Sequence, residues 1–187
     1  MRYIDEISNY IPKNEQEIKD KEVILELYKT NGDNILYRDS KVAHMSASII
    51  VINEHHDKVL FGYHNLYKHY GWLGGHADGM DDMKMVAFKE LKEESGIEYF
   101  KLLEDGPISL EILPVAPHIK NGEFVSAHVH LNLTYLVEVN EDTKIRIKPD
   151  ENSDLKWIKF EDANSFAKEE VMFPVYDKIF EYIKKTH

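Results

Sequence analysis

A glycine-rich stretch that leads into a helix with three closely spaced glutamates constrains this chain more than any other feature. Four glycines fall between residues 71 and 79, so the backbone there can turn sharply and approach a ligand closely. Asp81 and Asp82 follow as helix caps, and residues 83–95 contain no Gly or Pro before Gly96, a typical C-cap. The sequence therefore predicts a loop followed by a helix over residues 83–95.

The three glutamates of this helix lie on its apolar side. A helix advances roughly 100° per residue, so Glu90, Glu93 and Glu94 continue the stripe that Met83 and Val86 begin. Three carboxylates this close repel one another and should not be buried without partners. A divalent cation with oxygen ligands would resolve the conflict, and a solvated acidic face is the alternative.

The spacing of this stretch resembles the signature of the Nudix hydrolases, which reads G, five residues, E, seven residues, R-E-U-x-E-E-x-G-U, with U a bulky aliphatic residue. Here the box runs from Gly75 to Ile97. Asp81 stands where the family has Glu, and Lys89 where it has Arg. Both keep the charge, although Lys cannot make the planar bidentate contact of Arg.

This resemblance implies an α/β fold, a Nudix-type α/β/α sandwich with a mixed β-sheet. It also implies a pyrophosphohydrolase that acts on phosphoanhydride bonds with Mg²⁺ or Mn²⁺ as cofactor. The substrate would be a nucleoside diphosphate linked to another moiety, as in a nucleotide sugar, a dinucleoside polyphosphate or a nucleoside triphosphate. The alternative is a non-catalytic Nudix-fold module that senses a nucleotide.

The resemblance also assigns roles within the box. Glu90, Glu93 and Glu94 would be metal ligands, with the main-chain carbonyl of Gly74 as a further ligand. Glu93 is the preferred general base, and Glu151, outside the box, is the alternative. Lys89 and Asp81 would support these groups. The predicted catalytic residues are Glu90, Glu93, Glu94 and Lys89.

Length and charge narrow the class of protein. The 187 residues are expected to form a single Nudix domain over 1–187, with 1–39 a helical N-terminal extension and 40–187 the catalytic core. A net charge of −11 disfavours a nucleic-acid polymer as partner, and a small-molecule nucleotide is expected instead. No apolar stretch approaches the ~20 residues of a membrane span. We find no signal peptide and expect a cytoplasmic location.

The chain contains no cysteine, which excludes disulfides and thiolate metal sites. It also argues against an isopentenyl diphosphate isomerase, which shares the Nudix fold and uses a catalytic cysteine.

The N-terminal extension shows two helical patterns. Isoleucines with helical spacing precede Pro12, and Asn14 with Glu17 has the form of a capping box for a helix that reaches about Lys29. Ile18 and Leu25 are expected to be buried on this helix. The extension could pack on the sheet, shape the substrate cleft or form a homodimer contact, and we favour packing.

The predicted sheet has one unusually polar face. Strands are expected over 43–53, 58–63 and 155–160, with a hairpin of 108–119 and 123–139 that turns at Asn121 and Gly122. Helices are expected over 161–168 and 175–185. In the second hairpin strand one face consists of His128, His130, Asn132 and Thr134.

This face is either solvated or the wall of a substrate cleft, and the predicted substrate contacts are His76, His128 and His130. Two histidines two residues apart on a strand can also bind zinc, but the sequence shows no third ligand.

Overall fold

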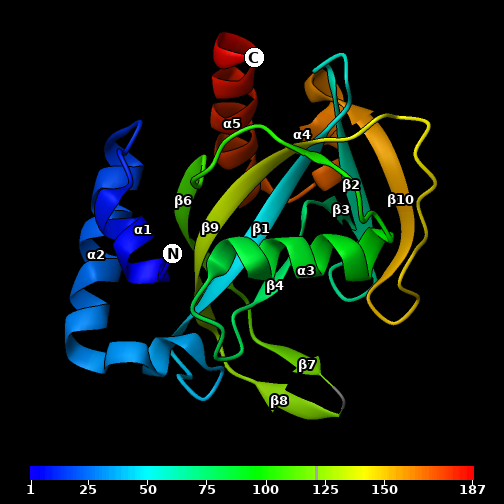
Figure 1. The fold of residues 1–187 in the computed structure, drawn as a ribbon. Helices are drawn as coiled ribbons and strands as arrows, with labels where there is room; N and C mark the ends of the chain where they lie inside the picture. Colours follow the sequence, from blue (N-terminus) through cyan, green and yellow to red (C-terminus); the bar gives the residue numbers. More distant parts are fainter. Residues whose placement is uncertain (121) are drawn as a thin grey trace.

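In a computed structural model that describes residues 1–120 and 122–187, one mixed sheet lies between helices (Figure 1). The helices are α1 (Tyr3–Asn9), α2 (Glu15–Asn31), α3 (Met83–Ser95), α4 (Ala163–Ala167) and α5 (Phe173–Thr186), with short 3-10 turns η1 (Gly32–Leu36), η2 (Phe160–Asp162) and η3 (Glu170–Met172). The strands are β1 (Ala43–Ile52), β2 (Lys58–His64), β3 (Tyr70–Gly71), β4 (Leu73–His76), β5 (Lys101–Leu102), β6 (Ser109–Val115), β7 (His118–Lys120), β8 (Glu123–Val125), β9 (His128–Glu138) and β10 (Asn152–Lys159).

The central strand pair, β1 with β9, is parallel and runs in register from Ala43 with Val129 to Ile52 with Glu138. The other pairs of this sheet are antiparallel, and its main order is β10-β2-β1-β9-β5, with β3 on β2, β4 on β1 and β6 on β9. The mixed sheet and the α/β class agree with the expectation from the sequence.

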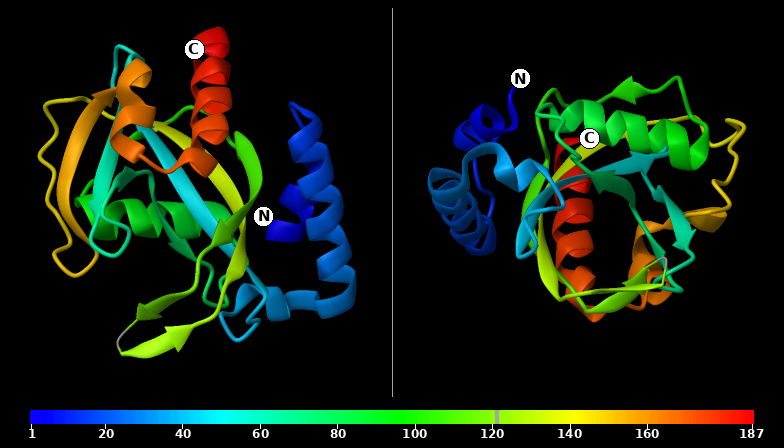
Figure 2. Two further views of the ribbon diagram at one scale, coloured as in Figure 1. Left: turned by 180° about the vertical axis from the view of Figure 1, so that it is seen from behind. Right: turned by 90° about the horizontal axis from the view of Figure 1, so that it is seen from below.

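Strand β1 divides the core because its side chains alternate between the two faces. Its odd-numbered residues, such as Met45 and Ile49, join the apolar cluster that contains Val86 and Leu91 of α3. Its later even-numbered residues, such as Ile50, join a second cluster with α5. Figure 2 shows α3 and α5 on opposite faces of the sheet, which is the expected sandwich.

The N-terminal segment packs against the sheet beside β6 (Figure 1). Asn14 caps α2, since its side chain accepts the Glu17 N–H at 2.9 Å. The expectation that Ile18 is buried is wrong, because 45% of it is exposed. Helix α2 instead buries Glu17 and Ile24, which are seven residues apart and therefore share a face. The Glu17 carboxylate is satisfied by the Tyr10 hydroxyl and the Lys13 N–H.

The expected long hairpin is two separate pairings. β6 pairs with β9 from Ser109–Thr134 to Val115–His128, and β7 and β8 form a small sheet of their own beyond it. Pro117, which has no N–H to donate, lies between the two ladders. Of the predicted turn, Asn121 lies outside the described residues and Gly122 has a positive φ of 82°.

No helix among the described residues has both the length and the apolar character needed to cross a bilayer.

Candidate active site

Helix α3 begins and ends where the sequence predicts, and both ends are capped. The Asp82 side chain accepts the Met85 N–H at 3.1 Å. Gly96 has the left-handed φ of 72° and donates its N–H to the Lys92 carbonyl at 2.9 Å. With its buried apolar side fixed against β1, the helix holds its glutamates in defined directions.

The structure separates the three box glutamates. Glu90 and Glu94, four residues apart, are buried, with 8% and 7% of their surface exposed. The Glu93 side chain is 38% exposed. Glu151, from the turn before β10, joins the two buried residues, and one oxygen from each of Glu90, Glu94 and Glu151 lies within 4.8 Å of the others.

The glycines of the loop let the backbone of β4 approach these carboxylates. The Gly74 N–H donates to Glu94 Oε2 at 3.1 Å. A Cβ on Gly75 would come within 2.5 Å of the Glu90 carboxyl carbon, and one on Gly74 within 2.5 Å of the Ala47 carbonyl oxygen. Any larger residue at these two positions would displace strand β1 or the carboxylate.

Burial makes the two inner carboxylates hard to ionise. It raises the pKa of Glu94 to about 8, and the nearby charge of Glu90 adds to the effect. Burial also raises the pKa of Glu90, although Lys89, with its Nζ 3.3 Å from Glu90 Oε1, opposes the rise. Two acidic groups held this close without sufficient positive charge form a natural cation site.

Glu93 has a different environment because Lys148 lies beside it. Lys148 Nζ is 3.1 Å from Glu93 Oε2 and 3.1 Å from Glu151 Oε2. Its hydrogen bond lowers the pKa of Glu93, and Lys89, whose Nζ is 3.6 Å from Glu93 Oε1, lowers it further. Sequence reasoning missed Lys148, because an isolated lysine in a polar connection carries no signal.

Asp81 binds the N-terminal segment. Its Oδ2 is 3.3 Å from Arg2 Nε, and its carbonyl accepts the Tyr3 N–H at 2.7 Å. Asp81, one of the two residues that depart from the family pattern, therefore anchors the start of the chain to the loop of the box.

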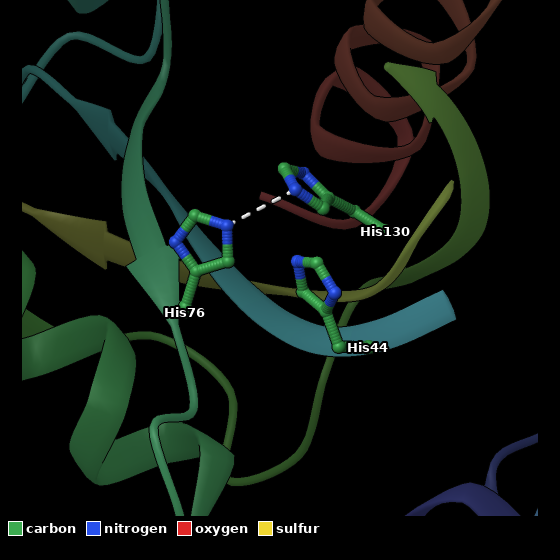
Figure 3. Close-up of side chains that lie close together, drawn as sticks. All are labelled: His44, His76 and His130. Carbon is green, nitrogen blue, oxygen red and sulfur yellow. Dashed lines mark hydrogen bonds between the residues drawn. The ribbon is translucent and has the colours of Figure 1, made fainter. Parts of the chain in front are cut away.

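Three histidines converge on the sheet face opposite α3 (Figure 3). His44 of β1 and His130 of β9 are register partners, and His76 of β4 pairs with Ser46, two residues further along β1. His76 Nε2 lies 3.1 Å from His130 Nε2. Sequence reasoning missed His44, although its alternation with Ser46 and Ser48 marked the same polar face.

The third predicted substrate contact, His128, lies at the edge of this group. Its ring centre is 4.9 Å from that of His44 and 5.2 Å from that of His130. Further along the face, Asn132 and Thr134 are buried in a hydrogen-bonded network with Glu111. That half of the face is therefore not solvated.

The histidine group is uncharged at neutral pH. Burial lowers the pKa of His76 to about 2 and that of His130 to about 3, and neighbouring imidazoles contribute in the same direction. Burial lowers the pKa of His44 as well. As neutral rings they can donate one hydrogen bond and accept another, or bind a metal.

Arg38 interacts electrostatically with both the carboxylate group and the histidine group. It pairs with Asp78, with Nε 2.6 Å from Oδ1, and this pair raises the pKa of Arg38. Glu90 and Glu151 raise it further, and the Arg38 charge in turn lowers the pKa of His76. Arg38 therefore lies within electrostatic range of both groups, although the sequence placed it in the N-terminal extension.

A model for the NUDIX domain matches residues 42–179, most of the chain. The chain therefore belongs to the Nudix family, whose hydrolases act on phosphoanhydride bonds. A search of curated proteins found no match.

Solved structures share the fold. An Ap4A hydrolase from C. elegans, in a binary complex, superposes with a TM-score of 0.58 at 20% identity, covering 75% of this chain and 98% of its own. A Nudix-family hydrolase from Clostridium perfringens gives a TM-score of 0.55 at 19% identity, covering 75% of this chain and 97% of its own. At this identity the likeness shows the fold.

Proposed function

We propose that the chain is a divalent-cation-dependent pyrophosphohydrolase that cleaves a nucleoside diphosphate linked to another moiety. The observation that carries the proposal is the group of Glu90, Glu94 and Glu151, with one oxygen from each within 4.8 Å of the others. Two of the three belong to the box that defines the family, and both are buried.

The donor set fits a hard cation. Mg²⁺ and Mn²⁺ prefer carboxylate and carbonyl oxygens, and the pKa of Glu94 is raised first by burial and then by the nearby charge of Glu90. When bound, the cation would neutralise charge on the phosphoryl oxygens and lower the pKa of the attacking water. Glu90, Glu94 and Glu151 would hold it, and by family likeness the carbonyl of Gly74 would add a ligand.

Glu93 is our candidate for the general base. Its side chain is partly exposed, and Lys148 keeps it ionised by lowering its pKa. An ionised carboxylate can accept a proton from water, which a protonated one cannot. Glu93 and Glu151 both contact Lys148, but only Glu151 has an oxygen within 4.8 Å of those of Glu90 and Glu94, so Glu151 is the better-placed ligand.

The polar sheet face would take the remainder of the substrate. We assign His76, His128 and His130 to hydrogen bonds with it, since the ring nitrogens of imidazole are hydrogen-bonding groups. Arg38, Lys89 and Lys148 would supply positive charge near the phosphates of a substrate that this acidic chain would otherwise repel.

The test is phosphate release from a panel of nucleoside triphosphates, dinucleoside polyphosphates and nucleotide sugars, coupled to a phosphatase and run with Mg²⁺ or Mn²⁺. We expect metal-dependent release by the wild type and none by Glu94→Gln. Near-normal turnover by that variant would overturn the metal assignment.

A nucleotide-sensing module is the second candidate, because Asp81 and Lys89 depart from the family pattern. Tight nucleotide binding without release of phosphate from any substrate would favour it. Location in the cytoplasm and a homodimer contact stay predictions from the sequence.

A further inference from the structure

We propose that His44, His76 and His130 form a second metal site, which takes a borderline cation such as Zn²⁺ and is separate from the carboxylate group. One ring nitrogen from each of the three lies within 4.8 Å of the others. His44 is on β1, and His76 and His130 are on the strands that pair with β1 on either side, β4 and β9 (Figure 3). The site goes beyond the proposed hydrolysis, in which the carboxylates hold the cation and His76 and His130 act only as hydrogen-bonding groups.

The spacing of the nitrogens suits a tetrahedral ion. With Zn–N distances of about 2.0–2.1 Å, two nitrogens of a tetrahedral site lie about 3.3 Å apart. His76 Nε2 and His130 Nε2 are 3.1 Å apart, so this pair needs almost no adjustment. The nitrogen of the third ring lies at most 4.8 Å from the other two and has to approach to about 3.3 Å, which small side-chain rotations can provide.

His44 carries an unused lone pair. Its Nδ1 lies 3.1 Å from the Ser40 carbonyl, and because a carbonyl only accepts, Nδ1 carries the proton. The neutral ring therefore has its lone pair on Nε2. This atom is buried and has no hydrogen-bond partner among the residues that the structure describes.

A backbone carbonyl that fixes the far nitrogen of a ligand histidine is a common feature of metal sites. An unpaired buried acceptor is destabilising, and a bound ion would remove this cost.

The chemistry of the ligands separates the two sites. Imidazole nitrogen suits Zn²⁺, Co²⁺ and Ni²⁺, whereas Mg²⁺ prefers oxygen. Three protein ligands leave a tetrahedral ion one position for water or for an oxygen of a bound molecule. We therefore expect zinc and magnesium to bind the chain together, each at its own site.

The experiment uses full-length, untagged protein stripped with a chelator. Zn²⁺ affinity is measured by competition with a chromophoric chelator, and Co²⁺ serves as the spectroscopic probe. Wild type should bind one zinc ion per chain and give the intense visible absorption of tetrahedral Co²⁺. Loss of a partner that only orients a ligand weakens metal affinity about 10–100-fold, so His76→Gln and His130→Gln should each weaken it by about 100-fold or more.

Two controls locate the ion. His55→Gln removes an exposed histidine in the turn after β1 and should leave zinc affinity unchanged. Glu90→Gln should leave both zinc affinity and the Co²⁺ spectrum unchanged. The thermal midpoint of each variant without metal shows whether it is folded.

Two results would overturn the proposal: zinc binding that survives both histidine substitutions but not Glu90→Gln, or the absence of tetrahedral Co²⁺ absorption in the wild type. Phosphate release with Mg²⁺ is measured separately, so failure of the hydrolase function leaves this test intact.

Discussion

Glu93 and Glu94 are neighbours in sequence, yet the structure shifts their pKa values in opposite directions. Glu94 points into the protein, where burial raises its pKa to about 8. Glu93 points outward to Lys148, whose hydrogen bond lowers its pKa. The same helix thus carries Glu94, whose ionised form a bound cation would stabilise, and Glu93, which is ionised without a cation.

Glu94 should make the metal-free protein less stable as pH rises. Its folded pKa of about 8 is above the ordinary 4.5, so its contribution to stability is fully present below about pH 4.5 and is lost as pH rises through about 8. We expect the free energy of unfolding in urea to fall by a few kcal/mol across this range. Glu94→Gln should flatten this dependence, and Mg²⁺ should stabilise the wild type most at the alkaline end.

The control is Glu22→Gln, which changes an exposed glutamate of α2 and should keep the wild-type pH dependence. An unfolding free energy that rises from about pH 5 to about pH 8 in the metal-free wild type would contradict the raised pKa.

The general base and the metal ligand can be told apart kinetically. Glu93→Gln should lower kcat by about 10²–10⁴-fold at saturating Mg²⁺, the range for loss of a general base. Glu151→Gln should instead raise the Mg²⁺ concentration needed for half-maximal activity. Magnesium titrations of both variants check this, and the reverse pattern would assign the base to Glu151.

Gly75→Ala tests the close approach of β4 to α3. The new Cβ would lie 2.5 Å from the Glu90 carboxyl carbon and would push that side chain aside. We expect Mg²⁺ affinity to fall by about 10-fold or more. Gly106→Ala is the matched control, because a Cβ there meets nothing within 4 Å. Equal Mg²⁺ affinity of the two variants in calorimetry would argue that Glu90 is not a ligand.

Two isoleucines of α2 test how the N-terminal segment packs. Ile24 is fully buried, and Ile24→Ala should lower the free energy of unfolding by about 2–5 kcal/mol. Ile18 is 45% exposed, and Ile18→Ala should cost less than about 1 kcal/mol. Urea denaturation gives both values. A larger loss for Ile18 would mean that another surface covers this face in solution.

Features that depend on residues close together in the sequence are the ones the sequence predicts best. The limits of α3 follow from a cap at Asp82 and a left-handed Gly96, and both signals lie within a few residues of the ends they determine. The polar face of β9 follows from simple alternation. Membership of the Nudix family follows from the spacing of the box.

Long-range packing decides what the sequence could not. Helical geometry places Glu93 in the same sector as Glu90, but Lys148, from a connection far along the chain, draws it outward. The sequence offers Glu151 only as an alternative general base, and the fold brings it beside the buried pair of Glu90 and Glu94. The parallel register of β1 and β9 places His44 beside His130, and the sequence does not predict this pairing.

Lys178 of α5 shows how the two ends of the chain depend on one another. Its Nζ is 2.8 Å from Glu17 of α2 and 2.9 Å from Glu111 of β6, and both carboxylates are buried. Detaching α5 would leave the buried carboxylates of Glu17 and Glu111 without the charge of Lys178, which costs several kcal/mol. Opening of α5 should therefore release α2 as well, and the slowest amides of the two helices should exchange hydrogen at a common rate.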